Sequence, residues 1–458
     1  MKSPQEFIQE LFVSRQSVMA GKTWTVTPPQ RLVMFFIGLI ILGTVLLILP
    51  WAHPAGKACS LVDACYTATS AVCVTGLIVR DTAADFTPFG QVVILALIQI
   101  GGLGYMLLAT AAAVLLGRRI GITERSAIAQ SLNLDSPEGM GRFVRSVVYF
   151  TLVMEAVGAV LITVSYWPQH SPGQAMALGV FHAISSFNNA GFSLFPDNFM
   201  STGLKPLALA VVMGLTVIGG IGFLVYQEVW DHVRGQRQRY SVHTKLVAIT
   251  TVLLLGLGWL GLFFGAHLNW LQALFLSVTS RTSGFNMQDI GMLPVGAHWL
   301  LILLMFVGAS PGGTGGGIKT TTAATVLVAL WAMMRGRDRV AVFSRELPQD
   351  TVQKALVISI TMALVVVGMS MLIIACETGA QSLRKVLFEV TSALGTVGLS
   401  TGDGHILSLS ATFSPVGKIL IILTMFIGRL GPLTLGVASA AKTAPAQLTY
   451  PEGRVSVG

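Results

Sequence analysis

The sequence predicts an all-α integral membrane protein built from four tandem copies of one helical unit. Hydrophobic residues make up 53% of the 458 residues, and only 11% are charged, whereas soluble proteins carry roughly 25% charged residues. The apolar residues also fall in blocks long enough to cross a hydrocarbon core of about 30 Å. This composition argues against disordered and soluble globular classes, and four Cys are too few for a disulfide scaffold.

The distribution of charge predicts the orientation. The 29 Lys and Arg outnumber the 20 Asp and Glu, for a net charge of +9, and most basic residues lie between the apolar blocks rather than on one nucleic-acid-binding face. The basic segments are 1–31, 118–145, 234–245, 335–354 and 442–454. By the positive-inside rule all five face the cytoplasm, so both termini are expected there and the number of spans is even. The polar first 30 residues lack the pattern of a signal peptide.

Each unit is expected to contain an outgoing span, a short re-entrant helix, a glycine-containing loop and a returning span, which gives eight transmembrane helices around one pseudo-fourfold pore. The outgoing spans are expected at 32–50, 144–166, 245–265 and 353–376, and the returning spans at 88–116, 206–230, 297–333 and 413–441. The short helices at 60–72, 173–187, 269–280 and 381–394 cannot cross a bilayer. The expected domains are a cytoplasmic arm (1–30), the repeats (31–117, 143–232, 244–334, 352–441) and a cytoplasmic tail (442–458).

The four loops align on one glycine each, which is always followed by Leu or Phe: Gly76, Gly191, Gly284 and Gly398. Non-helical backbone at membrane depth is tolerated where it is buried in protein or lines a water-filled path. Four such loops about one axis would place carbonyl oxygens where they replace the hydration shell of a cation. The alternative is a set of helix-breaking glycines in a bundle without symmetry. The predicted filter residues are Val74, Thr75, Gly76, Asn189, Ala190, Gly191, Thr282, Ser283, Gly284, Thr396, Val397 and Gly398.

These loops resemble those of the Trk/Ktr/HKT superfamily of potassium transporters. The stretches that carry the resemblance are SAVCVTGL at 70–77, SFNNAGFS at 186–193, TSRTSGFN at 279–286 and SALGTVGLSTG at 392–402. The chain looks closest to the Ktr-type ion-translocating membrane subunit, because no additional pair of spans precedes the first repeat and the tail contains Tyr450-Pro451-Glu452-Gly453.

The resemblance implies potassium uptake across the cytoplasmic membrane of a bacterium, with potassium bound at the filter carbonyls. A glycine rather than a serine at Gly76 implies potassium over sodium, while sodium dependence stays open. The resemblance also implies a homodimer and a separate cytosolic RCK-type regulatory ring, so that any nucleotide binds the partner and this chain holds no cofactor.

The segment 308–320 interrupts the third returning span with many Gly and a Pro, which cannot remain a regular helix. We interpret it as a flexible loop under the filter that obstructs the path, and the resemblance implies the same intramembrane gate. A packing kink is the alternative, and a phosphate-binding loop is disfavoured because Ile318 separates the last Gly from the Lys. The candidate gate residues are Gly312, Gly313, Thr314, Gly315, Gly316, Gly317, Lys319 and Arg429.

Arg429 lies within the last span, where a charge costs a few kcal/mol on insertion scales, so it should face the interior or the pore. It is either a barrier to cations or a structural partner of a buried acid. Lys319 either lines the pore or snorkels to the interface. The acids Asp63, Glu155 and Glu389 either attract cations or act structurally, by capping amides or pairing with Arg281, and we favour the structural role.

The sequence contains no arrangement that predicts an enzyme. The eight His show no metal-ligand spacing, and no nucleophile, base and acid are grouped. The nearest alternatives are a Trk-like, proton-linked or sodium-conducting member of the superfamily and an unrelated secondary transporter. Secondary transporters commonly contain inverted repeats, whereas the four units predicted here all start from the same side of the membrane. Arg335, Arg337 and Arg339 are either docking points for the regulatory partner or plain membrane anchors.

Overall fold

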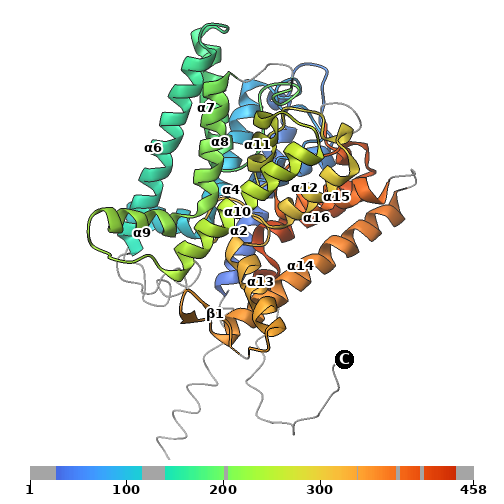
Figure 1. Ribbon diagram of the computed structural model, residues 1–458. Helices are drawn as coiled ribbons and strands as arrows, with labels where there is room; N and C mark the ends of the chain where they lie inside the picture. Colours follow the sequence, from blue (N-terminus) through green and yellow to red (C-terminus); the bar gives the residue numbers. More distant parts are fainter. Residues whose placement is uncertain are drawn as a thin grey trace, which may run out of the picture.

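A computed structural model describes residues 27–115, 140–200, 205–337, 339–377, 382–402 and 407–439 of the chain. Most of the predicted arm, most of the basic segment 118–145 and the whole predicted tail lie outside these residues. The described part is a bundle of helices that surrounds a set of irregular central loops (Figure 1).

The four predicted outgoing spans are present as unbroken helices. They are α2 (Pro28–Ile48), α6 (Met140–Tyr166), α10 (Val242–Gly265) and α14 (Gln349–Cys376). Each contains a continuous apolar stretch long enough to cross a membrane. The prediction of an all-α membrane protein with four outgoing spans is therefore confirmed.

The four short helices are also present close to their predicted positions. They are α3 (Leu61–Val72), α7 (Pro172–Phe187), α11 (Trp270–Thr279) and α15 (Leu383–Gly395). Two begin with side-chain caps, since Ser60 accepts a hydrogen bond from the amide of Asp63 and Asn269 accepts one from the amide of Gln272. Their C-terminal halves are almost entirely buried, so each helix ends inside the molecule.

All four returning spans are broken, whereas the sequence predicted an interruption only in the third. They are α4 (Pro88–Leu115), α8 (Pro206–Ile221) with α9 (Phe223–Val233), α12 (Val295–Phe306) with α13 (Thr320–Met334), and α16 (Pro415–Leu430) with α17 (Pro432–Ser439). α9 turns by 93° from α8, and α17 by 95° from α16, as Figure 1 shows for α9 at the lower end of α8. Among the described helices four are long, unbroken spans, and six spans result if each bent pair counts as one.

A glycine in the left-handed region causes three of the breaks. Gly104, Gly222 and Gly431 have φ values of 76°, 100° and 79°, a region that a residue with a side chain rarely enters. Pro432 follows the third and cannot continue the hydrogen bonding of α16. In repeat 3 the segment 307–319 separates α12 from α13, as the predicted interruption at 308–320 requires.

Glycines before the breaks let the returning spans pack directly on the short helices. A Cβ at Gly101, Gly219 or Gly428 would collide with the C-terminal backbone of the short helix in its own repeat. The returning spans therefore pack closely on the short helices, and their breaks lie next to the central loops.

The smaller elements lie outside the repeat pattern. A two-stranded hairpin, β1 (Ala341–Val342) and β2 (Arg345–Glu346), connects α13 to α14, with Ala341 paired to Glu346. It lies near α13 at the bottom of Figure 1. The 3-10 helices are η1 (Pro50–Ala52), η2 (Ile290–Met292) and η3 (Leu409–Thr412).

Candidate ion pathway

The four loops share one backbone conformation. In each loop the aligned glycine and the residue two positions before it both have positive φ, whereas the residue between them does not. The pairs are Val74 and Gly76, Asn189 and Gly191, Thr282 and Gly284, and Thr396 and Gly398. Because the sign of φ alternates, successive carbonyls turn to one side of the chain. The four loops that align in the sequence therefore also have matching backbone conformations in the structure.

The loops form a closed ring in the order of the sequence. A Cβ added to each aligned glycine would meet the carbonyl oxygen of the residue before the glycine in the next loop. The contacts run from Gly76 to Ala190, from Gly191 to Ser283, from Gly284 to Val397, and from Gly398 back to Thr75. At Gly76 the separation would be 2.5 Å. The ring therefore leaves no room for a side chain at these positions.

Hydrogen bonds behind the ring hold the loops. The amides of Gly76 and Gly398 donate to the hydroxyls of Ser70 and Ser392, at 3.1 and 3.0 Å. The large residues after the glycines, Leu77, Phe192, Phe285 and Leu399, are buried, as expected for side chains that pack behind the loops. These hydrogen bonds and the buried side chains together fix the loops from behind the ring.

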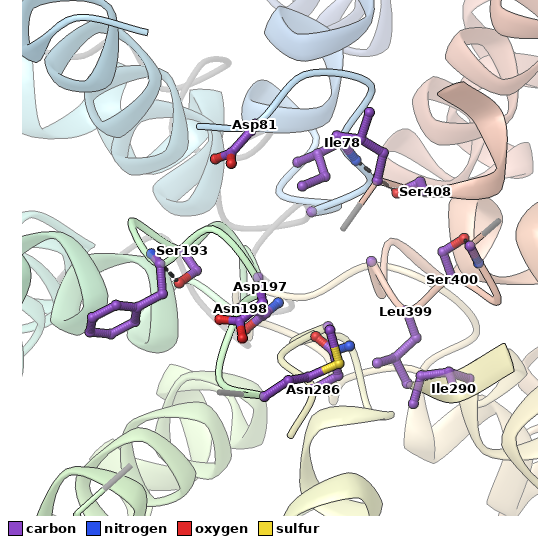
Figure 2. A pocket seen from close by; sticks show the side chains of 18 of the residues that line it. Ile78, Asp81, Ser193, Asp197, Asn198, Asn286, Ile290, Leu399, Ser400 and Ser408 are labelled. Atoms are coloured by element: carbon purple, nitrogen blue, oxygen red, sulfur yellow. Dashed lines mark hydrogen bonds between the residues drawn. The ribbon is translucent and has the colours of Figure 1, made fainter. Parts of the chain in front are cut away.

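A cavity of about 60 Å³ covers one side of the ring, and all four aligned glycines line it. Figure 2 shows residues from all four repeats around this cavity, with Asp81 and Asp197 among those labelled. Asp289 also lines it, so three carboxylates give the mouth a negative potential that attracts cations.

Sequence reasoning did not assign these carboxylates to the site, although a signal exists. An aspartate follows each aligned glycine by five or six residues: Asp81, Asp197, Asp289 and Asp403. Asp403 lies outside the described residues. The fourfold repetition of this spacing would have predicted an acidic mouth.

The segment 307–319 lies on the other side of the ring and contacts residues of repeats 2, 3 and 4. The amide of Gly316 donates to the hydroxyl of Thr396 at 2.9 Å, and a Cβ at Gly315 would collide with the hydroxyl of Thr282. The hydroxyl of Thr314 donates to the carbonyl of Phe187 at 3.1 Å. The segment closes on itself where the amide of Gly308 donates to the carbonyl of Ile318 at 2.8 Å. It therefore lies directly behind the ring, where the sequence predicted it.

Arg429 binds this segment from α16. Its guanidinium donates to the carbonyls of Thr314, Gly101 and Gly102, the last at 3.1 Å. Within the described residues it forms no salt bridge, so the alternative that it pairs with a buried acid is wrong there. Lys319 turns to the same segment and donates to the carbonyl of Gly315 at 2.6 Å, rather than extending to an interface. Two positive charges thus lie beneath the ring.

Asp63 has the structural role that we favoured for the acids. It pairs with Lys418 at 2.8 Å and with Arg80 at 3.3 Å. Arg281 does not pair with it and instead donates to the carbonyl of Gly308 at 3.2 Å, so the proposed pairing of the acids with Arg281 is wrong within the described residues.

Glu389 is also structural. Its carboxylate accepts hydrogen bonds from the hydroxyl of Ser400 at 2.6 Å, from the amide of Ser410 at 3.0 Å and from the Ser410 hydroxyl. It thereby joins α15 to the segment that precedes α16. The remaining acid, Glu155, accepts hydrogen bonds from the side-chain amides of Gln99 and Asn188 among the described residues.

Comparisons with known proteins agree with this architecture. A family model described as a cation transport protein, TrkH, matches residues 7–448. The chain is 39% identical over 445 residues to the Ktr system potassium uptake protein B of Bacillus subtilis strain 168, covering 94% of this chain and 97% of the relative.

Two further similarities extend over most of the chain. The potassium/sodium uptake protein NtpJ of Enterococcus hirae is 33% identical over 449 residues, which cover 94% of this chain and 97% of the relative. The crystal structure of the potassium transporter TrkH from Vibrio parahaemolyticus superposes with a TM-score of 0.72 at 21% identity, covering 92% of this chain and 86% of that chain. This structural likeness shows a shared fold.

Proposed function

The chain belongs to the TrkH family of cation transport proteins, and we propose that it takes up potassium as the ion-conducting subunit of a Ktr-type system. It is a multi-pass membrane transporter and not an enzyme, as the sequence predicted. The relative in B. subtilis, at 39% identity over nearly the whole of both chains, is a Ktr system potassium uptake protein, which supports potassium as the transported ion.

The closed ring of glycine loops is the observation that carries the mechanism. In the proposal, the backbone carbonyls of the twelve predicted filter residues replace the hydration shell of potassium. Four short helices end at the ring, and the partial negative charge at a helix C-terminus favours a cation there. The aspartates of the cavity mouth raise the local concentration of potassium before it enters.

The gate in this proposal is the segment 308–320 with Lys319 and Arg429. It blocks the path beneath the ring through the bond from Gly316 to Thr396 and through the bond from Arg429 to the carbonyl of Thr314. Opening requires these bonds to break and the segment to move. The two positive charges repel a potassium ion that leaves the ring, so their displacement lowers the barrier to permeation.

Sodium conduction is the second candidate, because a relative that is 33% identical is a potassium/sodium uptake protein. A glycine at all four ring positions favours potassium. Sodium as a coupling ion is compatible with either potassium or sodium as the conducted ion.

The proposed setting is the cytoplasmic membrane of a bacterium, with both termini and the basic connections in the cytoplasm and the acidic cavity outside. We propose that the chain forms a homodimer, holds no cofactor and is regulated by a separate cytosolic RCK-type subunit that binds the nucleotide. Arg335 and Arg337 stack on Trp331 at 4.0 and 5.8 Å and offer this subunit a fixed cationic contact.

Uptake of potassium by a host that lacks its own importers tests this function. The wild-type chain, expressed with its regulatory partner, should restore growth at low potassium, whereas Gly76→Ser should lower the ratio of potassium to sodium uptake by about tenfold or more. The reason is that the new side chain meets the Ala190 carbonyl of the ring, and the loss of a well-fitted oxygen is worth on the order of 1.4 kcal/mol.

Gly38→Ser is the matched control, because Gly38 lies in α2 and a Cβ there meets no atom within 4 Å. It should leave uptake unchanged. An unchanged potassium-to-sodium ratio in Gly76→Ser, at wild-type expression, would show that the ring is not the filter.

A further inference from the structure

Glu155 is a carboxylate buried within a membrane-spanning helix, and neither the filter nor the gate uses it. It lies on α6 and is only 6% exposed. None of the salt bridges among the described residues involves it. An ionisable side chain inside a membrane is expensive unless it is neutralised, and for that reason it usually marks a functional site.

Amides from two other helices surround the carboxylate. Gln99 of α4 donates from Nε2 to Oε2 of Glu155 at 3.2 Å, and Asn188, which caps the C-terminus of α7, donates from Nδ2 to Oε1 at 3.0 Å. The cluster therefore joins repeat 1 to repeat 2. The elements that pack against Glu155 face it with these neutral groups, and the charge of Arg429 is tied to the same stretch of α4 through the carbonyls of Gly101 and Gly102.

The cluster has fewer hydrogen-bond donors than it has acceptor oxygens. Nδ2 of Asn188 lies within 2.9–3.0 Å of three oxygens, those of the Gln99 amide, the Glu155 carboxylate and the Ile184 carbonyl. A side-chain amide carries two hydrogens on its nitrogen, so one of the three oxygens has no donor from it. Oδ1 of Asn188 is buried and has no hydrogen-bond partner either. The cluster thus has a surplus of oxygens and one negative charge.

We propose that Glu155, Gln99 and Asn188 form a binding site for one small monovalent cation, either a proton on the carboxyl group or a sodium ion between the oxygens. A proton turns one carboxylate oxygen into a donor and so adds a donor to a cluster that has too few. A sodium ion is a hard cation that oxygen ligands of this kind suit. Both cations supply the single positive charge that the buried cluster lacks.

The site is placed to communicate with the ion pathway. Asn188 directly precedes the filter residue Asn189, and its Oδ1 occupies the space in which Gly102 would carry a side chain. The carbonyl of Gly102 in turn binds Arg429. Loss of the cation would therefore reorient an amide that touches both a filter loop and the backbone that anchors the gate. This consequence rests on the proposed function, whereas the binding site does not.

Thermal unfolding of the purified full chain tests the site without any transport assay. In choline chloride at alkaline pH, added sodium chloride should raise the Tm of the wild type if sodium is the ligand, and Glu155→Gln should abolish that shift. If the ligand is a proton, sodium has no effect and the infrared spectrum of the wild type contains a protonated-carboxyl band that Glu155→Gln removes.

Glu389→Gln is the matched control, because Glu389 is a buried carboxylate whose oxygens already accept from Ser400 and Ser410; it should keep the sodium shift or the Glu155 band. If Glu155→Gln does not fold, Gln99→Ala takes its place, because it removes one oxygen of the site. It should weaken the sodium-induced rise in Tm or displace the protonated-carboxyl band. The proposal is wrong if the wild type shows neither response, or if Glu155→Gln retains it. Stabilisation by potassium chloride reports the filter separately, so its absence would count against the proposed function alone.

Discussion

At the scale of single residues, the ion pathway combines backbone strain with a small number of buried charges. Val74 and Thr396 are β-branched residues with φ values of 56° and 49°, a conformation that costs of order 1–3 kcal/mol and persists only where its surroundings enforce it. The enforcing contacts are hydrogen bonds from the next amides, those of Thr75 and Val397, to the carbonyls of Ser70 and Ser392 at 2.8 and 2.9 Å. In the proposed function the carbonyls of these loops turn to one axis, so the strain belongs to the proposed filter.

Arg429→Ala should raise the basal flux of the chain. The substitution removes one of two positive charges behind the ring and frees the carbonyl of Thr314. If this charge adds about 1.4 kcal/mol to the barrier, rubidium uptake into proteoliposomes that contain the chain alone rises about tenfold.

Arg335→Ala is the control for removing a positively charged side chain elsewhere, since Arg335 stacks on Trp331 at the end of α13. It should leave the basal flux as it is. A fall in flux for Arg429→Ala, in protein that still unfolds cooperatively, would mean that this side chain organises the pathway instead of blocking it.

At the scale of elements, the sequence predicted the helices that depend on local patterns. It did not predict the breaks that depend on contacts with other parts of the fold. The outgoing and short helices follow from hydropathy, length and capping, and α10 and α15 begin within three residues of the predicted positions. The breaks at Gly222 and Gly431 were not predicted because the apolar pattern continues across them, and a helical glycine cannot be told from a left-handed one without its neighbours. The Glu155 cluster was missed for the same reason, since its partners come from α4 and α7.

Gly222→Ala tests the broken returning span of repeat 2. Gly222 has a φ of 100°, and a Cβ there would collide with the carbonyl of Pro311 in the segment beneath the ring. A left-handed residue with a side chain costs about 1–2 kcal/mol before any collision. We expect a lower Tm and a disturbed gate, measured as thermal unfolding in detergent and as rubidium flux.

Gly214→Ala, on the same helix α8, separates this effect from helix propensity. A Cβ at Gly214 meets no atom within 4 Å, and alanine favours a helix over glycine by about 1 kcal/mol. The Tm should therefore stay the same or rise. Equal effects of the two substitutions would show that the break at Gly222 is not required.

At the scale of the whole molecule, the two ends of the bundle carry opposite charge. The end that opens into the cavity presents Asp81, Asp197 and Asp289. The opposite end carries the connection between α9 and α10 and the hairpin β1–β2, where Arg237, Arg239, Lys245 and Arg345 line one hollow. In the proposed orientation, this asymmetry attracts cations at the outer face and keeps the basic face in the cytoplasm, which is the polarity that an uptake system needs.

Cysteine labelling in intact cells tests this polarity. Gln169 lies in the turn between α6 and α7, and Arg239 lies in the connection before α10, and both side chains are exposed. In a background with Cys59, Cys65 and Cys376 replaced by serine, Gln169→Cys should react with a membrane-impermeant maleimide from outside, and Arg239→Cys only in inverted vesicles. Buried Cys73 serves as the unreactive reference. The reverse labelling would place the acidic cavity in the cytoplasm. Since the ring and its mouth face the same side, the chain would then collect cations from inside the cell rather than import them.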